Sequence, residues 1–187
     1  MINETINGID LIFDTSGASF SPMNIDRGTL AMLSVAEFSH DDKVLDLGCG
    51  YGVVGIYAAK KIGTQNVVMS DVDNICVELS RKNASLNGVD GISVILSDGF
   101  TGITDNDFTV ILSNPPYHTD FSVPKLFIEK GFNRLKIGGK MYMVTKRKEW
   151  YKKKFIAIFG GVKISDVDGY FVFSAEKRSM KYAAGGK

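Results

Sequence analysis

From residue 43 onward, short apolar runs alternate along the chain with stretches that carry apolar residues at helical spacing. The runs are rich in Val, Ile and Leu, which is typical of strands buried on both faces of a parallel sheet. This alternation therefore predicts an α/β fold in which helices cover both faces of a mostly parallel sheet. The expected strands are Val44–Leu47, Val67–Ser70, Ile92–Leu96, Thr109–Ser113 and Met141–Thr145, and the expected helices are Val53–Ile62, Asn74–Leu86 and Pro124–Leu135.

The end of the chain departs from this alternation. Two strand-like runs, Val162–Val167 and Tyr170–Ala175, are separated only by Asp168-Gly169, a dipeptide typical of tight β hairpins. Because the strands of a hairpin are antiparallel, we expect the sheet to end in an antiparallel edge strand.

The chain has 187 residues, which is the size of one domain, and no Pro-rich linker divides it. We expect a single domain over residues 1–187, with an extended lead-in over 1–25, a core over 26–178 and a frayed tail over 179–187. Asp26 or Thr29 is expected to cap a helix that runs to about Phe38.

The formal net charge of +1 hides an uneven distribution, because residues 1–110 carry a balance of −9 and residues 111–187 a balance of +10. Such asymmetry indicates a polyanion-facing surface in the basic part.

The two cysteines cannot build a disulfide framework, nor a zinc site without both histidines, so we expect reduced thiols and no metal. The N-terminus lacks the features of a signal peptide and no apolar run is long enough to span a membrane, which predicts a cytoplasmic protein.

The most informative stretch is Val44–Gly52, where a buried strand carries a carboxylate, Asp46, and then turns through three alternate glycines into a helix. Glycines permit a sharp turn and let a ligand approach the backbone. Residues 50–55 also match the G-x-G-x-x-G fingerprint of dinucleotide-binding folds, and Asp71 follows at the distance that fingerprint expects. A carboxylate would repel a pyrophosphate, however, and suits an amino group or a sulfonium cation. S-adenosylmethionine (SAM) is therefore the better ligand.

A second motif, Asn114-Pro115-Pro116-Tyr117, follows the apolar run of the fourth expected strand and uses two of only four prolines. Consecutive prolines remove two backbone donors and leave rigid carbonyls that can only accept hydrogen bonds. If the side-chain oxygen of Asn114 and the carbonyl of Pro115 accept the two hydrogens of an exocyclic amino group, its nitrogen is oriented to attack a methyl group. Tyr117 would stack on the flat acceptor.

These motifs, in this order, resemble the class I SAM-dependent methyltransferases, and more narrowly the small-methyltransferase family that contains the ribosomal RNA (guanine-N2-) methyltransferases of the small subunit. The resemblance covers roughly residues 20–176 and includes Asp26-Arg-Gly-Thr29 and Leu135-Lys-Ile-Gly-Gly139. It implies a Rossmann-like, mostly parallel seven-stranded sheet and a product S-adenosylhomocysteine.

The resemblance also implies roles for particular residues. Asp71 would accept hydrogen bonds from the ribose hydroxyls of SAM, Asp98 would accept from its adenine amino group, and Asp46 would lie near the methionine end through water. Gly48, Gly50 and Gly52 would let SAM lie against the backbone, and Asn114 would contact both SAM and the acceptor. The catalytic set is Asn114, Pro115 and Tyr117, and His118 is left out of it because a loop histidine is more often solvated.

A basic run follows the fifth expected strand, at the sheet edge that carries the ligand loops. It is either the solvated face of an amphipathic helix or a set of phosphate contacts for RNA, and we favour the second interpretation. The candidate RNA contacts, besides Tyr117, are Lys146, Arg147, Lys148, Lys152, Lys153 and Lys154.

Together these features predict a SAM-dependent N-methyltransferase that acts on an exocyclic amino nitrogen, that of guanine in ribosomal RNA. The expected partner is ribosomal RNA or a ribosomal subunit, and a monomer is favoured. The same Asn-Pro-Pro-Tyr motif serves glutamine-amide methyltransferases of the release-factor type and adenine amino-methyltransferases, which stay open as alternatives. A SAM- or RNA-binding assembly factor is the non-enzymatic alternative, and an NAD-dependent oxidoreductase is the alternative at the level of the fold.

Overall fold

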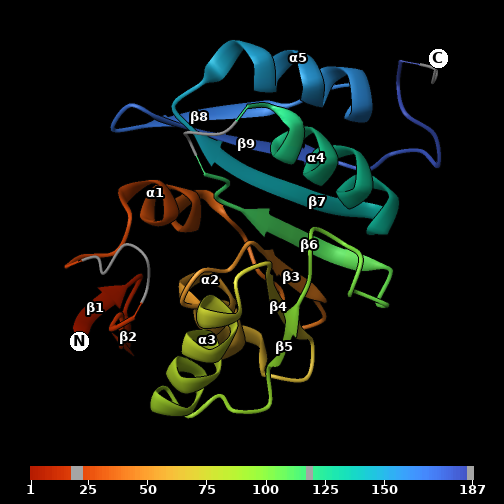
Figure 1. The fold of residues 1–187 in the computed structure, drawn as a ribbon. Coiled ribbons are helices and arrows are strands. Elements are labelled where there is room, and N and C mark those ends of the chain that lie inside the picture. The colour runs from red at the N-terminus through yellow and green to blue at the C-terminus, as the bar shows by residue number, and fades with distance from the viewer. Residues whose placement is uncertain (18–22, 117–119, 185–187) are drawn as a thin grey trace.

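The computed structural model describes residues 1–17, 23–116 and 120–184. Helices flank a central sheet, and a short hairpin lies outside the helical layer (Figure 1). The strands are β1 (Ile2–Ile6), β2 (Ile9–Phe13), β3 (Val44–Leu47), β4 (Val67–Asp71), β5 (Ser93–Leu96), β6 (Phe108–Ser113), β7 (Leu135–Thr145), β8 (Lys163–Val167) and β9 (Tyr170–Glu176). The helices are α1 (Arg27–Val35), α2 (Val53–Ile62), α3 (Asn74–Leu86), α4 (Ser122–Arg134) and α5 (Lys148–Phe159).

In the described part of the chain the central sheet has seven strands in the order β5-β4-β3-β6-β7-β9-β8. The strands from β5 to β7 are parallel to one another, which confirms the α/β fold expected from the alternation of strands and helices. The strand order reverses between β3 and β6. Open α/β sheets bind ligands at such a reversal, outside the carboxyl ends of the strands.

Alternating side chains of the strands divide the core into two layers. Val44 packs with helices α1 to α3, whereas the next residue, Leu45, packs with α4 and α5. Figure 1 shows α4 and α5 on one side of the sheet and α2 and α3 on the other. Every residue of β3 is buried, which explains why its sequence is apolar apart from Asp46.

Local capping signals set the ends of the helices. Asp73 caps α3 by accepting a hydrogen bond from the Ile75 backbone N–H at 2.8 Å, and Asn87-Gly88 ends it with Gly88 at φ 67°. Asp26 rather than Thr29 caps α1, since its Oδ2 accepts from the Thr29 N–H at 2.9 Å.

The C-terminal hairpin forms as expected, with Asp168 and Gly169 both at positive φ, and its antiparallel pairing at the end of the sheet confirms the prediction. The antiparallel strand is β9, which pairs with β7 on one side and with β8 on the other. The edge strand is therefore β8, and β8 runs parallel to β7. The hairpin signal in the sequence predicts only that its two strands pair with each other, and the structure shows that the second strand, β9, lies next to β7.

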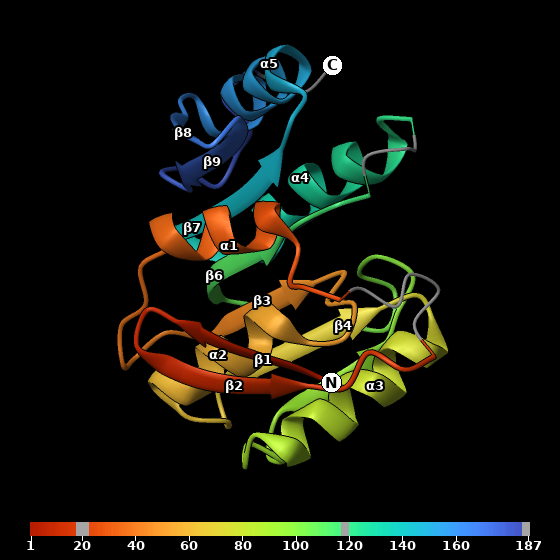
Figure 2. The ribbon, with the colours of Figure 1, turned by 90° about the vertical axis from the view of Figure 1, so that its left-hand side faces the viewer.

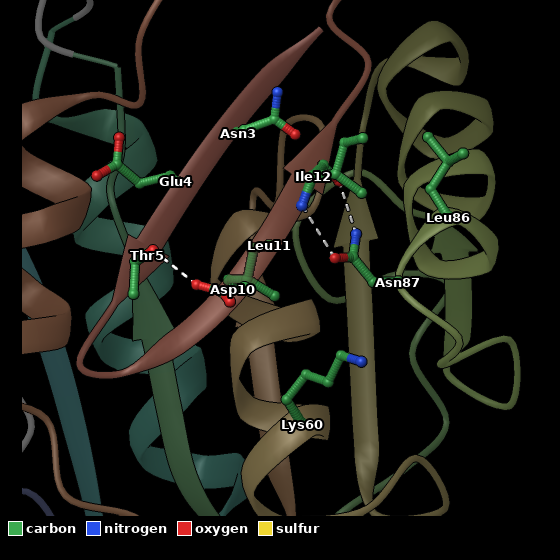
Figure 3. A pocket seen from close by; sticks show the side chains of 9 residues that line it. All are labelled: Asn3, Glu4, Thr5, Asp10, Leu11, Ile12, Lys60, Leu86 and Asn87. Atoms are coloured by element: carbon green, nitrogen blue, oxygen red, sulfur yellow. Dashed lines mark hydrogen bonds between the residues drawn. The ribbon is translucent and has the colours of Figure 1, made fainter.

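The expectation of an extended lead-in over residues 1–25 is corrected for residues 2–13, which fold into the antiparallel hairpin β1–β2. Its turn, Asn7-Gly8, has φ values of 47° and 82°, the signature of a tight hairpin that the sequence carries between two apolar runs. The hairpin lies over α2 and α3 (Figure 2). Two hydrogen bonds to Asn87 hold the hairpin there. The Asn87 side chain accepts one from the Ile12 N–H and donates the other to the Ile12 carbonyl, as Figure 3 shows.

The expectation of a frayed tail over residues 179–187 is corrected for residues 182–184. The Tyr182 ring packs edge-on against Phe132 of α4, and its hydroxyl donates to the Glu129 carbonyl. The backbone N–H groups of Ala183 and Ala184 donate to the carbonyls of Ile158 and Ala157 at the end of α5. This part of the tail therefore contacts both α4 and α5.

Asn83 gives the first testable prediction. It is fully buried in α3, and its side chain accepts from the Asp14 N–H and donates to the Asp14 and Tyr51 carbonyls. Asn83→Ala leaves these backbone groups unpaired, so we expect the free energy of unfolding to fall by about 2–3 kcal/mol. Urea denaturation measures this loss. Ser85→Ala on the exposed face of the same helix is the control, and an equal loss in both variants would contradict the proposed anchoring of the hairpin.

Candidate active site

A cavity with a volume of about 990 Å³ lies at the carboxyl ends of β3, β4, β5 and β6. It opens at the point where the strand order reverses, between the β3–α2 loop and the segment after β6. Its volume is at the upper end of the range for sites that enclose a small ligand, roughly 300–1,000 Å³. Six residues expected from the sequence line it: Gly48, Gly50, Asp71, Asp98, Asn114 and Pro115.

Asp71, at the end of β4, braces the glycine loop. Its Oδ2 accepts from the Gly50 N–H at 2.9 Å, and its Oδ1 accepts from the Asp73 N–H at 3.0 Å. Each carboxylate oxygen can accept a second hydrogen bond, so Asp71 can still receive donors from a ligand in the cavity.

The structure explains why glycine is needed at positions 50 and 55, for a different reason at each. Gly50 lies at φ 57° and a Cβ there would meet no atom within 4 Å, so its backbone faces open space. Gly55, in the first turn of α2, has the opposite role, because a Cβ there would lie only 2.3 Å from the Met69 side chain. Gly55 therefore lets α2 pack closely against β4. Gly52 is the N-cap residue of α2 at φ 97° and does not line the cavity.

Asp46 lies behind the loop rather than in the cavity wall. It is 2% exposed, and its Oδ2 accepts from the Gly55 N–H at 2.8 Å. Burial, the largest cause, and the charge of Asp71 together raise the pKa of Asp46 to about 7 against the lowering effect of the hydrogen bond from Gly55. Its side chain thus holds the start of α2 in place, on the side of the loop away from the cavity.

The side chain of Asn114 is held in one orientation by α1. Its Nδ2 donates to Asp26 Oδ2 at 2.8 Å and to Thr29 Oγ1 at 3.0 Å. Because a carboxylate can only accept, the amide nitrogen must face Asp26, and the amide oxygen must face away from it. The sequence did not assign a site role to Asp26 or Thr29, although both lie in the Asp-Arg-Gly-Thr stretch that belongs to the family resemblance.

Two buried side-chain atoms have no hydrogen-bond partner among the described residues, Asn114 Oδ1 and Ser70 Oγ. Both belong to residues that line the cavity. Buried polar atoms without a partner are rare in folded proteins, and a ligand in the cavity could supply the partners of these two.

The cavity wall also contains apolar residues that sequence analysis did not assign to the site. Val72 and Leu126 are large exposed side chains, and Phe127 packs its ring near Gly48. They come from α4 and from the residue after β4, and no local sequence pattern distinguishes them from residues of the hydrophobic core.

Tyr51 also lines the cavity, and burial together with the charge of Asp26 raises the pKa of its phenol to about 12, so it stays protonated. Tyr117 lies outside the described residues.

The basic run forms the start of α5 and the turn before it. Three of its cations lie over aromatic rings: Lys146 over Tyr170 at 4.7 Å, Arg147 over Phe121 at 4.1 Å and Lys148 over Phe171 at 5.1 Å. Lys152 and Lys153 are exposed farther along the helix. Lys154 instead forms a half-buried ion pair with Glu129 of α4.

A second cavity, of about 460 Å³, lies between the β1–β2 hairpin and the C-terminal ends of α2 and α3 (Figure 3). Lys60, Asp10 and Asn87 line it, and Thr5 donates to Asp10 beside it. The ends of these helices lie at the amino ends of the strands, opposite the edge where α/β sheets bind ligands, so the larger cavity is the candidate site. In residues 1–17, 23–116 and 120–184 no group of three or more His, Cys, Asp or Glu side chains could hold a metal ion, and no helix is long and apolar enough to cross a membrane.

The chain is similar to a methyltransferase family model and to curated proteins over most of its length. Residues 10–174 match the family model of the methyltransferase small domain. The uncharacterized protein YbxB of Bacillus subtilis is 30% identical over 174 residues, which are 90% of this chain and 87% of that protein. Ribosomal RNA small subunit methyltransferase C of Pseudomonas putida is 32% identical over 161 residues, 83% of this chain and 48% of that protein. The chain thus spans about half the length of the ribosomal RNA methyltransferase relatives.

The fold has close counterparts among solved structures. A 16S rRNA N2 methyltransferase of T. thermophilus, in complex with AdoMet and guanosine, superposes with a TM-score of 0.81 at 24% identity and covers 95% of this chain and 50% of that chain. A methyltransferase of Pyrococcus furiosus superposes with a TM-score of 0.71 at 21% identity, over 93% of this chain and 91% of that chain. At these identities the likeness establishes the Rossmann-like fold.

The buried carboxyl of Asp46 gives a prediction on pH dependence. Because its pKa is higher in the folded chain than in the unfolded one, it contributes stability that is complete below about pH 4 and is lost as the pH rises to about 7. Asp46→Asn keeps an acceptor for Gly55 but cannot ionise. We expect the variant to match the wild type near pH 4 and to be more stable at pH 8, by up to about 4 kcal/mol. Urea denaturation at both pH values measures the difference, and an equal difference at the two values would refute the assignment.

Proposed function

The chain belongs to the methyltransferase small domain family, a family of S-adenosylmethionine-dependent methyltransferases, and we propose that it methylates an exocyclic amino nitrogen, that of guanine in ribosomal RNA. The observation that carries the proposal is the orientation of Asn114. Its amide nitrogen is occupied by Asp26 and Thr29, and its buried oxygen has no partner among the described residues. An acceptor held in this way suits the hydrogens of an amino group.

The cavity fits SAM as cofactor. Gly50 presents its backbone to open space, Gly48 lines the cavity beside the Phe127 ring, and Asp71 and Asp98 place carboxylates at the ends of neighbouring strands. The apolar side chains of Val72, Leu126 and Phe127 offer surface for a flat base such as adenine. We propose that Asp71 holds the ribose hydroxyls and Asp98 the adenine amino group, while Asp46 acts indirectly by fixing the loop.

SAM supplies, when bound, an electrophilic methyl group on a sulfonium sulfur. An amino group conjugated to a base is a poor nucleophile, because its lone pair is delocalised into the ring. Asn114 Oδ1 and the Pro115 carbonyl would accept its two hydrogens, orient the nitrogen and increase its electron density. With SAM held beside Asn114, the oriented nitrogen would take the methyl group while the electron pair of the carbon–sulfur bond stays on sulfur, and its surplus proton would leave to water.

The relatives named as ribosomal RNA methyltransferases support RNA as the acceptor. The three cations over Tyr170, Phe121 and Phe171 support it as well, because Lys146 and Lys148 follow the carboxyl end of β7 and so lie at the same sheet edge as the cavity. Phosphate contacts there would place an RNA strand next to Asn114. Since Lys154 is paired with Glu129, we assign the phosphate contacts first to Lys146 and Lys148.

The proposed function is tested by offering ribosomal RNA, ribosomal subunits, transfer RNA and a release factor to the chain with methyl-labelled SAM. Nucleoside and peptide mass analysis then identifies the product. We expect N2-methylguanosine in ribosomal RNA. Methylglutamine in the release factor, or N6-methyladenosine in any RNA, would replace the proposal by one of its alternatives.

Asn114→Ala is expected to lower methyl transfer by at least about 100-fold, because it removes an acceptor placed for the transition state. The affinity for SAM should change little, since the glycine loop and Asp71 are intact. Calorimetry and single-turnover transfer separate the two effects. Asp71→Ala is the contrasting variant, expected to weaken SAM binding at least about tenfold, and retained transfer by Asn114→Ala would remove Asn114 from the mechanism.

The double variant Lys146→Gln, Lys148→Gln is expected to reduce the slope of log affinity for RNA against log salt concentration by about two, one for each lost phosphate contact. Fluorescence anisotropy with a labelled RNA between 50 and 200 mM salt, a range of about fourfold, measures the slope. Lys60→Gln, Lys61→Gln at the end of α2 is the matched control with the same change of charge. Equal slopes in both double variants would contradict phosphate contacts by Lys146 and Lys148.

A further inference from the structure

In one corner of the cavity three residues offer hydrogen-bond acceptors to a ligand. Asp26, Asn114 and Pro115 all line it, and the prolines at 115 and 116 have no backbone N–H to offer. Asp26 is exposed at the cavity wall, whereas Asn114 Oδ1 is buried. Asp26 and Asn114 are in direct contact through the 2.8 Å hydrogen bond, so the carboxylate lies beside the amide.

The hydrogen bonds in this corner leave its acceptors open. Both donors that reach Asp26 from described residues, the Thr29 N–H and the Asn114 amide, meet its Oδ2. Its Oδ1 therefore keeps its capacity to accept. The amide of Asn114 has used its two N–H groups on Asp26 and Thr29, so it can offer a ligand only its oxygen.

We infer that Asp26 selects guanine as the acceptor by receiving its ring N1–H, while Asn114 Oδ1 and the Pro115 carbonyl receive the two hydrogens of the N2 amino group. The inference rests on the proposed function and assigns its specificity to one residue. Guanine presents three donors along this part of its Watson–Crick edge, N1–H and the two N2 hydrogens. Three acceptors match three donors, and enzymes that act on bases read this edge by hydrogen bonds.

The same corner disfavours the other amino acceptors. In adenine the ring nitrogen beside the amino group carries a lone pair, and in cytosine the same is true. In a glutamine amide the neighbour of the amino group is a carbonyl oxygen. Each of these would place an acceptor against the negative charge of Asp26, with two polar groups left unpaired, which costs binding affinity.

The test uses nucleosides that differ at the ring nitrogen. 2-Aminopurine riboside keeps the N2 amino group of guanosine but has a lone pair at N1, and adenosine has both the lone pair and a displaced amino group. We expect the wild-type chain, saturated with S-adenosylhomocysteine, to bind guanosine at least about tenfold more tightly than either. Competition binding followed by NMR measures the ratio, and the same ratio is read from methyl transfer to an RNA that carries guanine or 2-aminopurine at the target position.

Asp26→Asn is the decisive variant, because asparagine still caps α1 but can donate to a ring nitrogen. We expect the preference for guanosine over 2-aminopurine riboside to fall at least about tenfold. Thr29→Val is the matched control. It removes the other hydrogen bond to Asn114 without changing the charge, so it should weaken both nucleosides by the same factor and leave their ratio unchanged.

The outcomes separate the inference from the proposed function. A wild-type product other than methylguanine, or a wild-type preference for adenosine, overturns both. Methylation of guanine with an unchanged ratio in Asp26→Asn overturns only the inference, and Asp26 is then a residue that merely positions Asn114. A ratio that falls in Asp26→Asn and not in Thr29→Val supports the inference.

Discussion

The hydrogen bond from the Gly55 N–H to the buried carboxyl of Asp46 holds the β3–α2 loop, on which the site depends. It joins the end of the central strand to the first turn of α2, and Gly55 lets that turn pack against Met69 on β4. The chain between these two points, residues 47–54, must then bulge outward as the glycine loop. Asp71 on β4 braces that bulge through Gly50. Two carboxylates on neighbouring strands thus hold the loop, and a parallel sheet is what brings their strand ends to the same edge.

The second part of the site depends on contacts between distant segments. β6 lies beside β3, and the residues after it are held by α1 through the hydrogen bonds from Asn114 to Asp26 and Thr29. The glycine loop and the Asn114 segment therefore face each other across the reversal of strand order. The acidic part of the chain forms the side of the cavity that suits a cationic cofactor, and the basic part forms the start of α5 at the same edge. The net charge of +1 is the sum of the opposite charges of these two parts of the chain.

Most of the secondary structure could be predicted because its signals are local. The bounds of α2 and α3 and of β3 agree with the apolar periodicity, and Asp73 and Gly88 are found at the ends where their conformational preferences place them. The N-terminal hairpin carries an equally local signal, Asn7-Gly8 between apolar runs, which the expectation of an extended lead-in over residues 1–25 did not use. The packing of Tyr182 against Phe132 had no such signal, because a single aromatic residue in a polar tail does not indicate which distant side chain it will contact.

The sequence by itself determined the order of the elements, the family resemblance and the chemistry at the ends of the strands, since periodicity, caps and motifs act over a few residues. Only the tertiary structure decided that Asp26 holds Asn114, 88 residues away, that Lys154 is occupied by Glu129, and that Asp46 lies behind the loop instead of in the cavity wall. The physical reason is the same in each case. Whether a polar side chain is open to a ligand depends on which distant donors and acceptors the fold brings to it, and that pairing leaves no trace in local sequence.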